Sequence, residues 1–162
     1  VMPIVLFILI LLFAWPVHAA ETGASGLPIP RFVSLKSSEV NVRTGPGTRY
    51  PIAWVFRRDG MPVEITDEFD HWRKIRDSEG AGGWVHKTML SGERMGVVVG
   101  REARIVREDP AADAAPVLKA APKVIVKLLE CQKEWCRLRI ANTKGWLPKA
   151  QIWGVYPSET FH

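Results

Sequence analysis

The sequence predicts an all-β protein made of two small barrels in tandem, and three observations support this prediction. The chain of 162 residues repeats itself: at an offset of 63 Trp72 falls on Trp135, and at an offset of 62 Trp84 falls on Trp146. Short segments alternate polar and apolar residues with the period of two that is typical of half-buried strands. No segment keeps a helical period over the roughly 11 residues that an amphipathic helix needs.

The repeat divides the chain into two units of about 60 residues each. Two tryptophans that match at nearly one offset are hard to obtain by chance, and self-similarity of this length indicates a duplicated structural unit. We expect a first domain over residues 31–92 and a second, degenerate domain over residues 93–157. Residues 21–30 are then a linker and residues 158–162 a tail.

Each unit is predicted to consist of short strands and turns. The expected strands include residues 39–43, 61–66, 123–129 and 135–140. The run Thr-Gly-Pro-Gly at residues 44–47 predicts a turn, because proline fixes φ at the second position and glycine accepts a positive φ at the third. Residues 77–83 and 141–145 are hairpin-like connections. The alanine-rich segment 109–121 is interrupted by Pro110 and Pro116, which argue against a helix.

The first twenty residues predict export. Residues 3–17 are almost wholly apolar, but this run is shorter than the roughly 20 residues of a membrane-spanning helix. Small residues follow at Ala19 and Ala20, so we interpret residues 1–20 as a secretory signal peptide, with an uncleaved anchor as the alternative. Contact with a membrane is expected only through this segment, if it stays uncleaved.

The formal net charge of +5 lies entirely after Ala20. A basic protein inside the cell would suggest nucleic acid, whereas an exported one meets an anionic envelope. We therefore expect a periplasmic or cell-envelope protein that does not bind nucleic acid. Both signs of charge are interspersed in each half of the chain, which also fits an ordinary solvated surface.

The composition excludes several chemistries. The chain has 2 cysteines and 4 histidines, none of them at the spacing of a zinc site. No Ser/His/Asp constellation is evident, and the two repeats leave no segment for a separate catalytic domain. We expect no catalytic residue, no metal and no cofactor.

Several motifs resemble those of the bacterial SH3-like domain family. The run VNVRTGPGTRYPI (residues 40–52) resembles the opening motif of these domains, and WRKI (residues 72–75) resembles a later strand. GWVHKTML (residues 83–90) and GWLPKAQI (residues 145–152) resemble the closing segment. The end of the chain, residues 151–157, is similar to an exported version with two tandem SH3-like domains. The resemblance covers nearly all of residues 30–157 and implies two small β-barrels.

The second unit departs from the family pattern. It reads IVREDP where the first unit reads VRTGP, and it lacks both turn glycines. We therefore expect the main ligand surface on the first domain.

The two cysteines are expected to form a disulfide. Cys131 and Cys136 bracket four residues where the repeat predicts a hairpin, and such a loop places its flanking residues opposite each other. Their counterparts in the first unit are Glu68 and Arg73, which could form a salt bridge at the same place. An oxidising compartment favours the bond. A catalytic Cys–His pair is the alternative, but the second unit offers only the terminal His162.

Trp72 is the central candidate for ligand binding. It shares strand parity with Lys74 and Arg76, so it should face outward. The resemblance implies that Trp72 and, on the degenerate second unit, Trp135 each line a ligand groove. The candidate ligand-binding residues are Arg43, Tyr50, Trp54, Trp72 and His86.

An aromatic surface fringed by arginine suits an extended peptide or an acidic glycopeptide. The resemblance implies a non-catalytic, exported binding module that recognises peptidoglycan stem peptides or an envelope protein. Three alternatives stay open: the aromatic residues only finish the core at the barrel ends, the protein is a structural or self-associating scaffold, or it is an accessory regulator of a cell-wall hydrolase. The oligomeric state is not predicted.

Overall fold

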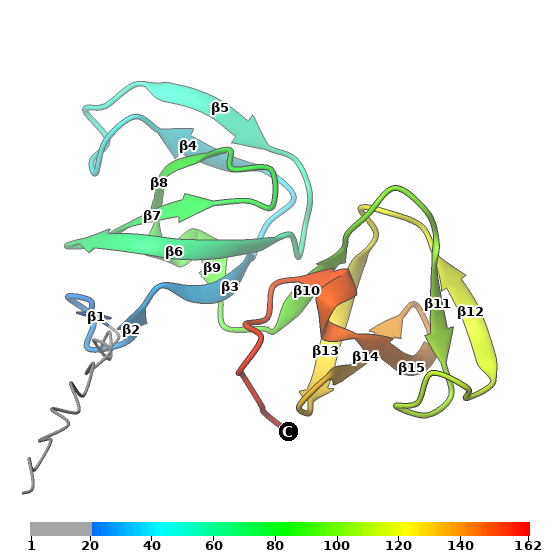
Figure 1. Cartoon of the computed structure of the whole chain (residues 1–162). Helices are drawn as coiled ribbons and strands as arrows, with labels where there is room; N and C mark the ends of the chain where they lie inside the picture. The colour runs from blue at the N-terminus through cyan, green and yellow to red at the C-terminus, as the bar shows by residue number, and fades with distance from the viewer. Residues whose placement is uncertain (1–20) are drawn as a thin grey trace, which may run out of the picture.

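The computed structural model describes residues 21–162, and the expected signal peptide at residues 1–20 lies outside the described residues. The described chain forms two seven-stranded antiparallel sheets, each curled into a barrel (Figure 1). The blue-to-green part of the ribbon is the first domain, and the green-to-red part is the second. The prediction of an all-β protein with two tandem barrels is confirmed.

The first barrel follows a short hairpin of β1 (Glu21–Thr22) and β2 (Pro28–Ile29). Its strands are β3 (Arg31–Leu35), β4 (Val40–Arg43), β5 (Ile52–Phe56), β6 (Pro62–Phe69), β7 (Trp72–Arg76), β8 (Gly82–His86) and β9 (Leu90–Ser91). They pair in the order β5-β4-β8-β7-β6-β3-β9, and a single 3₁₀ turn (Lys87–Met89) precedes the last strand.

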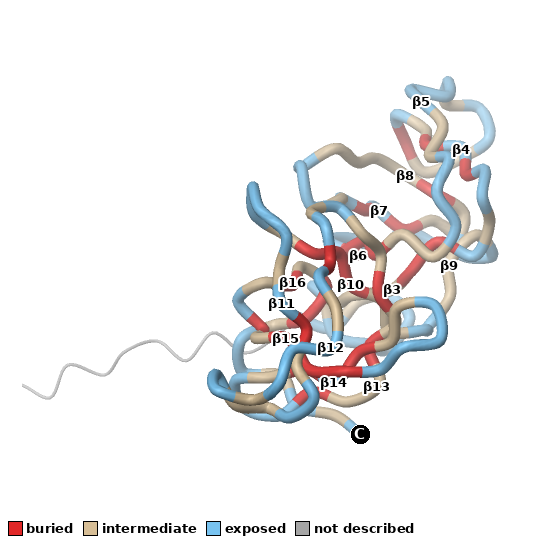
Figure 2. Tube along the Cα trace, turned by 90° about the vertical axis from the view of Figure 1, so that its right-hand side faces the viewer, coloured by how far each residue is buried: buried red, intermediate tan, exposed pale blue. Residues whose placement is uncertain are grey.

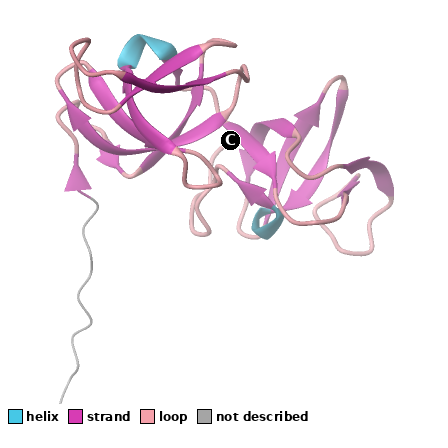
Figure 3. Ribbon diagram, turned by 90° about the horizontal axis from the view of Figure 1, so that it is seen from above, coloured by secondary structure: helices cyan, strands magenta, loops and turns pink. Residues whose placement is uncertain are grey.

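The second barrel repeats this topology strand for strand. Its strands are β10 (Met95–Val98), β11 (Arg104–Arg107), β12 (Pro116–Ala120), β13 (Ile125–Cys131), β14 (Trp135–Ile140), β15 (Thr143–Pro148) and β16 (Ile152–Trp153). The order β12-β11-β15-β14-β13-β10-β16 is the order of the first sheet with each strand replaced by its repeat partner. A 3₁₀ turn (Lys149–Gln151) again precedes the last strand (Figure 3). Within residues 21–162 there is no helix of the length and apolarity that crossing a membrane requires.

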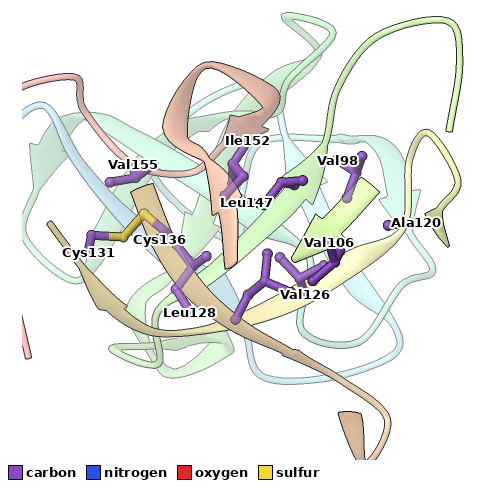
Figure 4. Packing of buried hydrophobic residues seen from close by; sticks show 11 residues of the cluster. Val98, Val106, Ala120, Val126, Leu128, Cys131, Cys136, Leu147, Ile152 and Val155 are labelled. Atoms are coloured by element: carbon purple, nitrogen blue, oxygen red, sulfur yellow. A yellow bond between two sulfur atoms is a disulfide. The ribbon is translucent and has the colours of Figure 1, made fainter. Parts of the chain in front are cut away.

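Each barrel has its own apolar core, seen as alternating buried stretches along the strands (Figure 2). In β4, Val40 and Val42 are fully buried while Asn41 between them is exposed, which is the alternation expected from the sequence. The first core is built by Leu35, Val40, Val42, Val63, Ile65, Ile75 and Val85. The second is built around Val98, Val106, Val126, Leu138 and Leu147 and includes both cysteines (Figure 4).

The disulfide between Cys131 and Cys136 is confirmed. The two residues are cross-strand partners on β13 and β14, with their Cα atoms 4.1 Å apart. Glu68 and Arg73 occupy the same place in the first barrel as partners on β6 and β7, and Arg73 Nε lies 3.1 Å from Glu68 Oε1. The expected salt bridge is therefore present.

Arg73 corrects one expectation about β7. We expected the charged side chains of this strand to point outward, but Arg73 shares the inward parity of Ile75 and is only 7% exposed. Its burial is tolerated because the guanidinium pairs with Glu68 and donates to the backbone carbonyl oxygens of Asp70 and Trp72, both at 2.9 Å.

The segments expected as linker and tail pack onto the barrels. In the β1–β2 hairpin, Ser25 donates to the Glu68 carboxylate through its backbone N (2.7 Å) and its Oγ (2.8 Å), and Arg31 Nη2 adds a third bond at 2.6 Å. At the other end, Phe161 exchanges two backbone hydrogen bonds with Cys131, and Glu159 pairs with Arg94. Neither segment is a free extension, because buried charges and backbone pairing hold both.

The two barrels are joined by an aromatic and polar contact. Phe32 of β3 packs against Trp153 and Tyr156, with ring centroids 4.9 Å and 4.6 Å apart. The Tyr156 hydroxyl donates to Glu64 Oε1 at 2.8 Å, and Arg76 binds the other carboxylate oxygen. Burial, together with the bond to Glu64, raises the pKa of Tyr156 well above its usual range. The chain after β16 thus bridges back to the first domain.

Candidate binding site

A groove of about 300 Å³ lies on the outer face of the first barrel. It opens where β4 and β8 separate, because these strands are paired only at Arg43 and Trp84. Its walls come from both strands, from β7 and from the 3₁₀ turn. The lining residues are Glu39, Asn41, Arg43, Thr48, Trp72, His86, Thr88 and Met89.

Trp72 and His86 form an aromatic corner in this groove. They are cross-strand partners on β7 and β8, and their rings meet edge to face with centroids 5.5 Å apart. The His86 ring is oriented by Thr88, whose Oγ1 lies 2.8 Å from Nδ1. A fixed edge-to-face pair presents a flat apolar surface with a polar tip, which is suited to an extended peptide.

Arg43 lines the groove and also holds its loop. Its Nη1 donates to the carbonyl oxygens of Tyr50 (2.7 Å) and Thr48 (3.2 Å), so the guanidinium secures the turn after β4. Glu39, which directly precedes β4 and shares the parity of Arg43, pairs with Arg57 at 2.9 Å. The groove therefore contains one positive and one negative side chain, and both have partners in the protein.

Tyr50 and Trp54 do not line this groove. The Tyr50 ring covers Gly45 so closely that a Cβ there would lie 2.4 Å from it, which explains the first turn glycine. Trp54 lies opposite Val42, whose side chain is in the core, and it contacts Phe56 at 6.1 Å between ring centroids. Trp54 is thus on the core-facing side of an edge strand, although it stays 39% exposed.

The structure brings together three of the five sequence-predicted residues, Arg43, Trp72 and His86. Sequence reasoning missed the polar residues of β4. Glu39 and Asn41 share the parity of Arg43, so the alternation of this strand would have placed them on the same face. Thr48, Thr88 and Met89 carried no such signal, because they enter from turns.

The second barrel carries an equivalent groove of about 330 Å³. Its lining residues are Ala103, Arg104, Ile105, Arg107, Ala112, Trp135, Pro148 and Gln151. Arg107 and Trp135 are the repeat partners of Arg43 and Trp72. Arg107 Nη1 donates to the carbonyl oxygen of Ala114 at 2.7 Å, as Arg43 does in its own loop.

The two grooves differ in chemistry. Ala103, Ile105 and Pro148 replace Glu39, Asn41 and His86, so the second groove contains no acidic side chain and no imidazole. The second groove is therefore open although its turn lacks both glycines. Its lining is apolar and basic, whereas the lining of the first groove is mixed and polar.

The histidines of the first barrel lie apart from any cluster of metal-ligand side chains in the described part of the chain. Among residues 21–162, no three His, Cys, Asp or Glu side chains lie close enough to hold a metal ion. His71 lies near His86, with ring centroids 6.0 Å apart, and its Nδ1 is 3.5 Å from the exposed Asp70 carboxylate.

Comparison with known proteins identifies the class. The chain matches the bacterial SH3 domain family over residues 36–92 and 101–154, one match for each barrel. It belongs to this family, whose domains are cell-wall-binding modules. The matched ranges contain Trp72 and Trp135 and the arginine that holds the loop in each barrel, Arg43 and Arg107.

Among solved structures, the chain is similar to an NlpC/P60 family protein from Bacillus cereus, at 16% identity and a TM-score of 0.34. The similarity covers 75% of this chain and 55% of that protein, so the chain spans about half its length. No curated protein matches the chain.

Proposed function

We propose that this protein is an exported, non-catalytic binding module of the cell envelope that recognises peptidoglycan stem peptides through the groove on its first domain. The observation that carries the proposal is the aromatic corner of Trp72 and His86 beside Arg43 in one groove. Membership in a family of cell-wall-binding modules supports a partner of this kind.

The lining of the first groove suits a short peptide that carries both charges. The faces of Trp72 and Met89 offer apolar contact for small side chains, and His86 offers a polar contact at the same wall. Arg43 and Glu39 stand on one side of the groove, where they would attract a carboxylate and an amine respectively. Stem peptides supply alternating apolar side chains, free carboxylates and an amine.

Tyr50 and Trp54 have a supporting role in this proposal. Tyr50 shapes the loop that Arg43 holds, and Trp54 covers the edge of the core beside Phe56. Arg43→Ala would therefore release the loop as well as remove a charge, so it is a poor probe of ligand contact. A substitution at Trp72 is more direct, because its side chain lies on the outward face.

The test compares the same substitution at repeat-related positions. Trp72→Leu should weaken binding to purified peptidoglycan about 30-fold, since truncating an aromatic hot spot commonly costs about 2 kcal/mol. Trp135→Leu, which changes the equivalent groove of the second domain, should weaken it much less. Cosedimentation with sacculi gives the affinity, and thermal melting of both variants gives the stability.

Two outcomes would contradict the proposal. Equal losses for the two variants would show that the first groove has no special part in binding. If binding is unchanged at a temperature where both variants are folded, and falls only where they unfold, then Trp72 only supports the barrel. In an NMR titration with a soluble stem peptide, chemical-shift changes at His86 and Asn41 would locate the contact in the groove directly.

A further inference from the structure

Charge is distributed unequally between the sheets of the two barrels. Strands β11 to β15 contain seven Lys or Arg residues and one Glu, a net of +6, whereas β4 to β8 contain four basic and three acidic residues, a net of +1. The seven basic residues of the second sheet are Arg104, Arg107, Lys119, Lys127, Arg137, Arg139 and Lys144. The acid is Glu130.

Three of these cations stand in one row across the sheet. Arg139 of β14 is directly opposite Lys127 of β13 on one side and Lys144 of β15 on the other. All three point away from the core, because Leu138, next to Arg139, is buried in it. Like charges placed directly opposite each other repel, so this row reduces the stability of the sheet.

A second row runs beside the first on the same face. Arg137 lies two residues before Arg139 on β14 and is opposite Trp146, and Arg107 of β11 is opposite Trp146 on its other side. Trp146 is only 8% exposed, so the two arginines flank a nearly covered indole. We call the surface formed by Arg107, Lys127, Arg137, Arg139 and Lys144 the basic face.

The protein supplies few counter-charges to the basic face. Within residues 21–162, Lys127 is its one member in a salt bridge, with Glu93 at 3.1 Å, and Glu130 of β13 lies opposite Arg137. Most acids of this domain lie instead in connections, among them Glu108, Asp109 and Asp113 between β11 and β12.

The corresponding row of the first barrel contains an acid–base pair. Arg76, the repeat partner of Arg139, is opposite Glu64 and bonded to it, and Tyr156 covers this pair. The row in the first barrel is thus neutralised, with Glu64 buried beneath Tyr156 and Arg76 still exposed, while the row in the second barrel is positive.

We propose that the basic face binds a linear anionic polymer that carries phosphate groups along its chain. Neighbouring strands lie about 4.8 Å apart, so a row of three cations spans about 10 Å and lets one chain contact several cations at once. Arginine binds phosphate through two parallel hydrogen bonds, which favours this anion. A face four strands wide, on a curved barrel, fits one polymer chain better than an extended lipid surface. This inference does not depend on the groove of the first domain.

The experiment uses long-chain inorganic polyphosphate as the probe and the whole described chain as the protein. Arg139→Gln/Lys144→Gln should lower the affinity at least 10-fold in calorimetric titration. The slope of log affinity against log salt should fall by about 1 to 2, since each phosphate contact contributes roughly 0.7 to 0.9. The control Lys36→Gln/Lys74→Gln removes two exposed charges from the first barrel and should change neither quantity substantially.

A second variant separates binding from folding. Lys144→Glu places an acid opposite Arg139, so the barrel should melt at the same temperature or higher while polyphosphate binding falls. Equal losses in the two double variants would overturn the inference, because net charge alone would then account for binding. The inference would also be overturned, in favour of a membrane surface, if Arg139→Gln/Lys144→Gln weakened binding to vesicles of anionic lipid as strongly as binding to polyphosphate.

The experiments distinguish a failure of the basic-face inference from a failure of the proposed peptide-binding function. The double variant of the basic face leaves the first groove unchanged, so binding of a soluble stem peptide should be unaffected. Trp72→Leu should in turn leave polyphosphate binding intact.

Discussion

Removing one hydroxyl group at Tyr156 tests whether the two barrels act as one structural unit. Tyr156 Oη donates to Glu64 Oε1 at 2.8 Å, and Glu64 is only 3% exposed. Tyr156→Phe keeps the ring against Phe32 but leaves one oxygen of a buried carboxylate without this donor. Hydrogen bonds to charged groups contribute about 1.5 to 3 kcal/mol, so we expect the free energy of unfolding to fall by about 2 kcal/mol.

The expected shift is large enough to measure by two methods. For a chain of this size, a loss of 1 kcal/mol lowers Tm by about 4 °C, so the melting temperature should fall by about 8 °C. Urea unfolding followed by tryptophan fluorescence should give the same free-energy difference. Because the bond connects the domains, calorimetry should also show the two barrels unfolding less cooperatively in the variant than in the parent.

The chain offers a matched control in its other tyrosine. Tyr50 Oη accepts only a 3.3 Å bond from Arg49 at the surface, so Tyr50→Phe should change stability by no more than about 0.5 kcal/mol. In a Glu64→Gln background, the loss on Tyr156→Phe should shrink to about 1 kcal/mol, because a bond to a neutral acceptor is about half as strong. If Tyr156→Phe and Tyr50→Phe melt at the same temperature, the reasoning is refuted, and the other contacts between the barrels are sufficient to hold them together.

Three further predictions concern the disulfide, the carboxylates of Glu68 and Glu159, and hydrolytic activity. Cys131→Ala/Cys136→Ala should lower the free energy of unfolding by about 2 kcal/mol, measured by urea unfolding, since the closed loop is short; a loss above about 5 kcal/mol would contradict a merely local staple. Burial acts to raise the pKa of Glu68 and of Glu159, but hydrogen bonds from Ser25 and Arg31, and from Arg94, outweigh it and lower both. The two carboxylates therefore stabilise the fold above about pH 4.3, and this stabilisation is lost as pH falls through their lowered pKa values. Glu68→Gln should make the loss of stability at acid pH less steep in a curve of unfolding free energy against pH. An unchanged acid part of the curve would count against this account. The purified protein should give no clearing zone on sacculus zymograms with added zinc, whereas a clearing zone would reveal hydrolysis.

Local and periodic features could be predicted from the sequence. The repeat of Trp72 in Trp135 and the alternation in β4 both predicted the tandem barrels, because strand parity and turn chemistry are properties of adjacent residues. The pairing of Cys131 with Cys136 followed from a hairpin that closes over four residues. The outward direction of Trp72 followed from the same parity argument.

Only the tertiary structure decided which candidates share a groove. Trp54 stands opposite Val42 on the core side of β5, while Arg43 of the neighbouring strand faces the groove. The face that Trp54 takes depends on the register in which β5 pairs with β4, which the sequence of one strand alone does not give. The bond between Tyr156 and Glu64 joins residues 92 apart, one in each barrel. Such contacts depend on how completed barrels meet, which no local pattern along the chain determines.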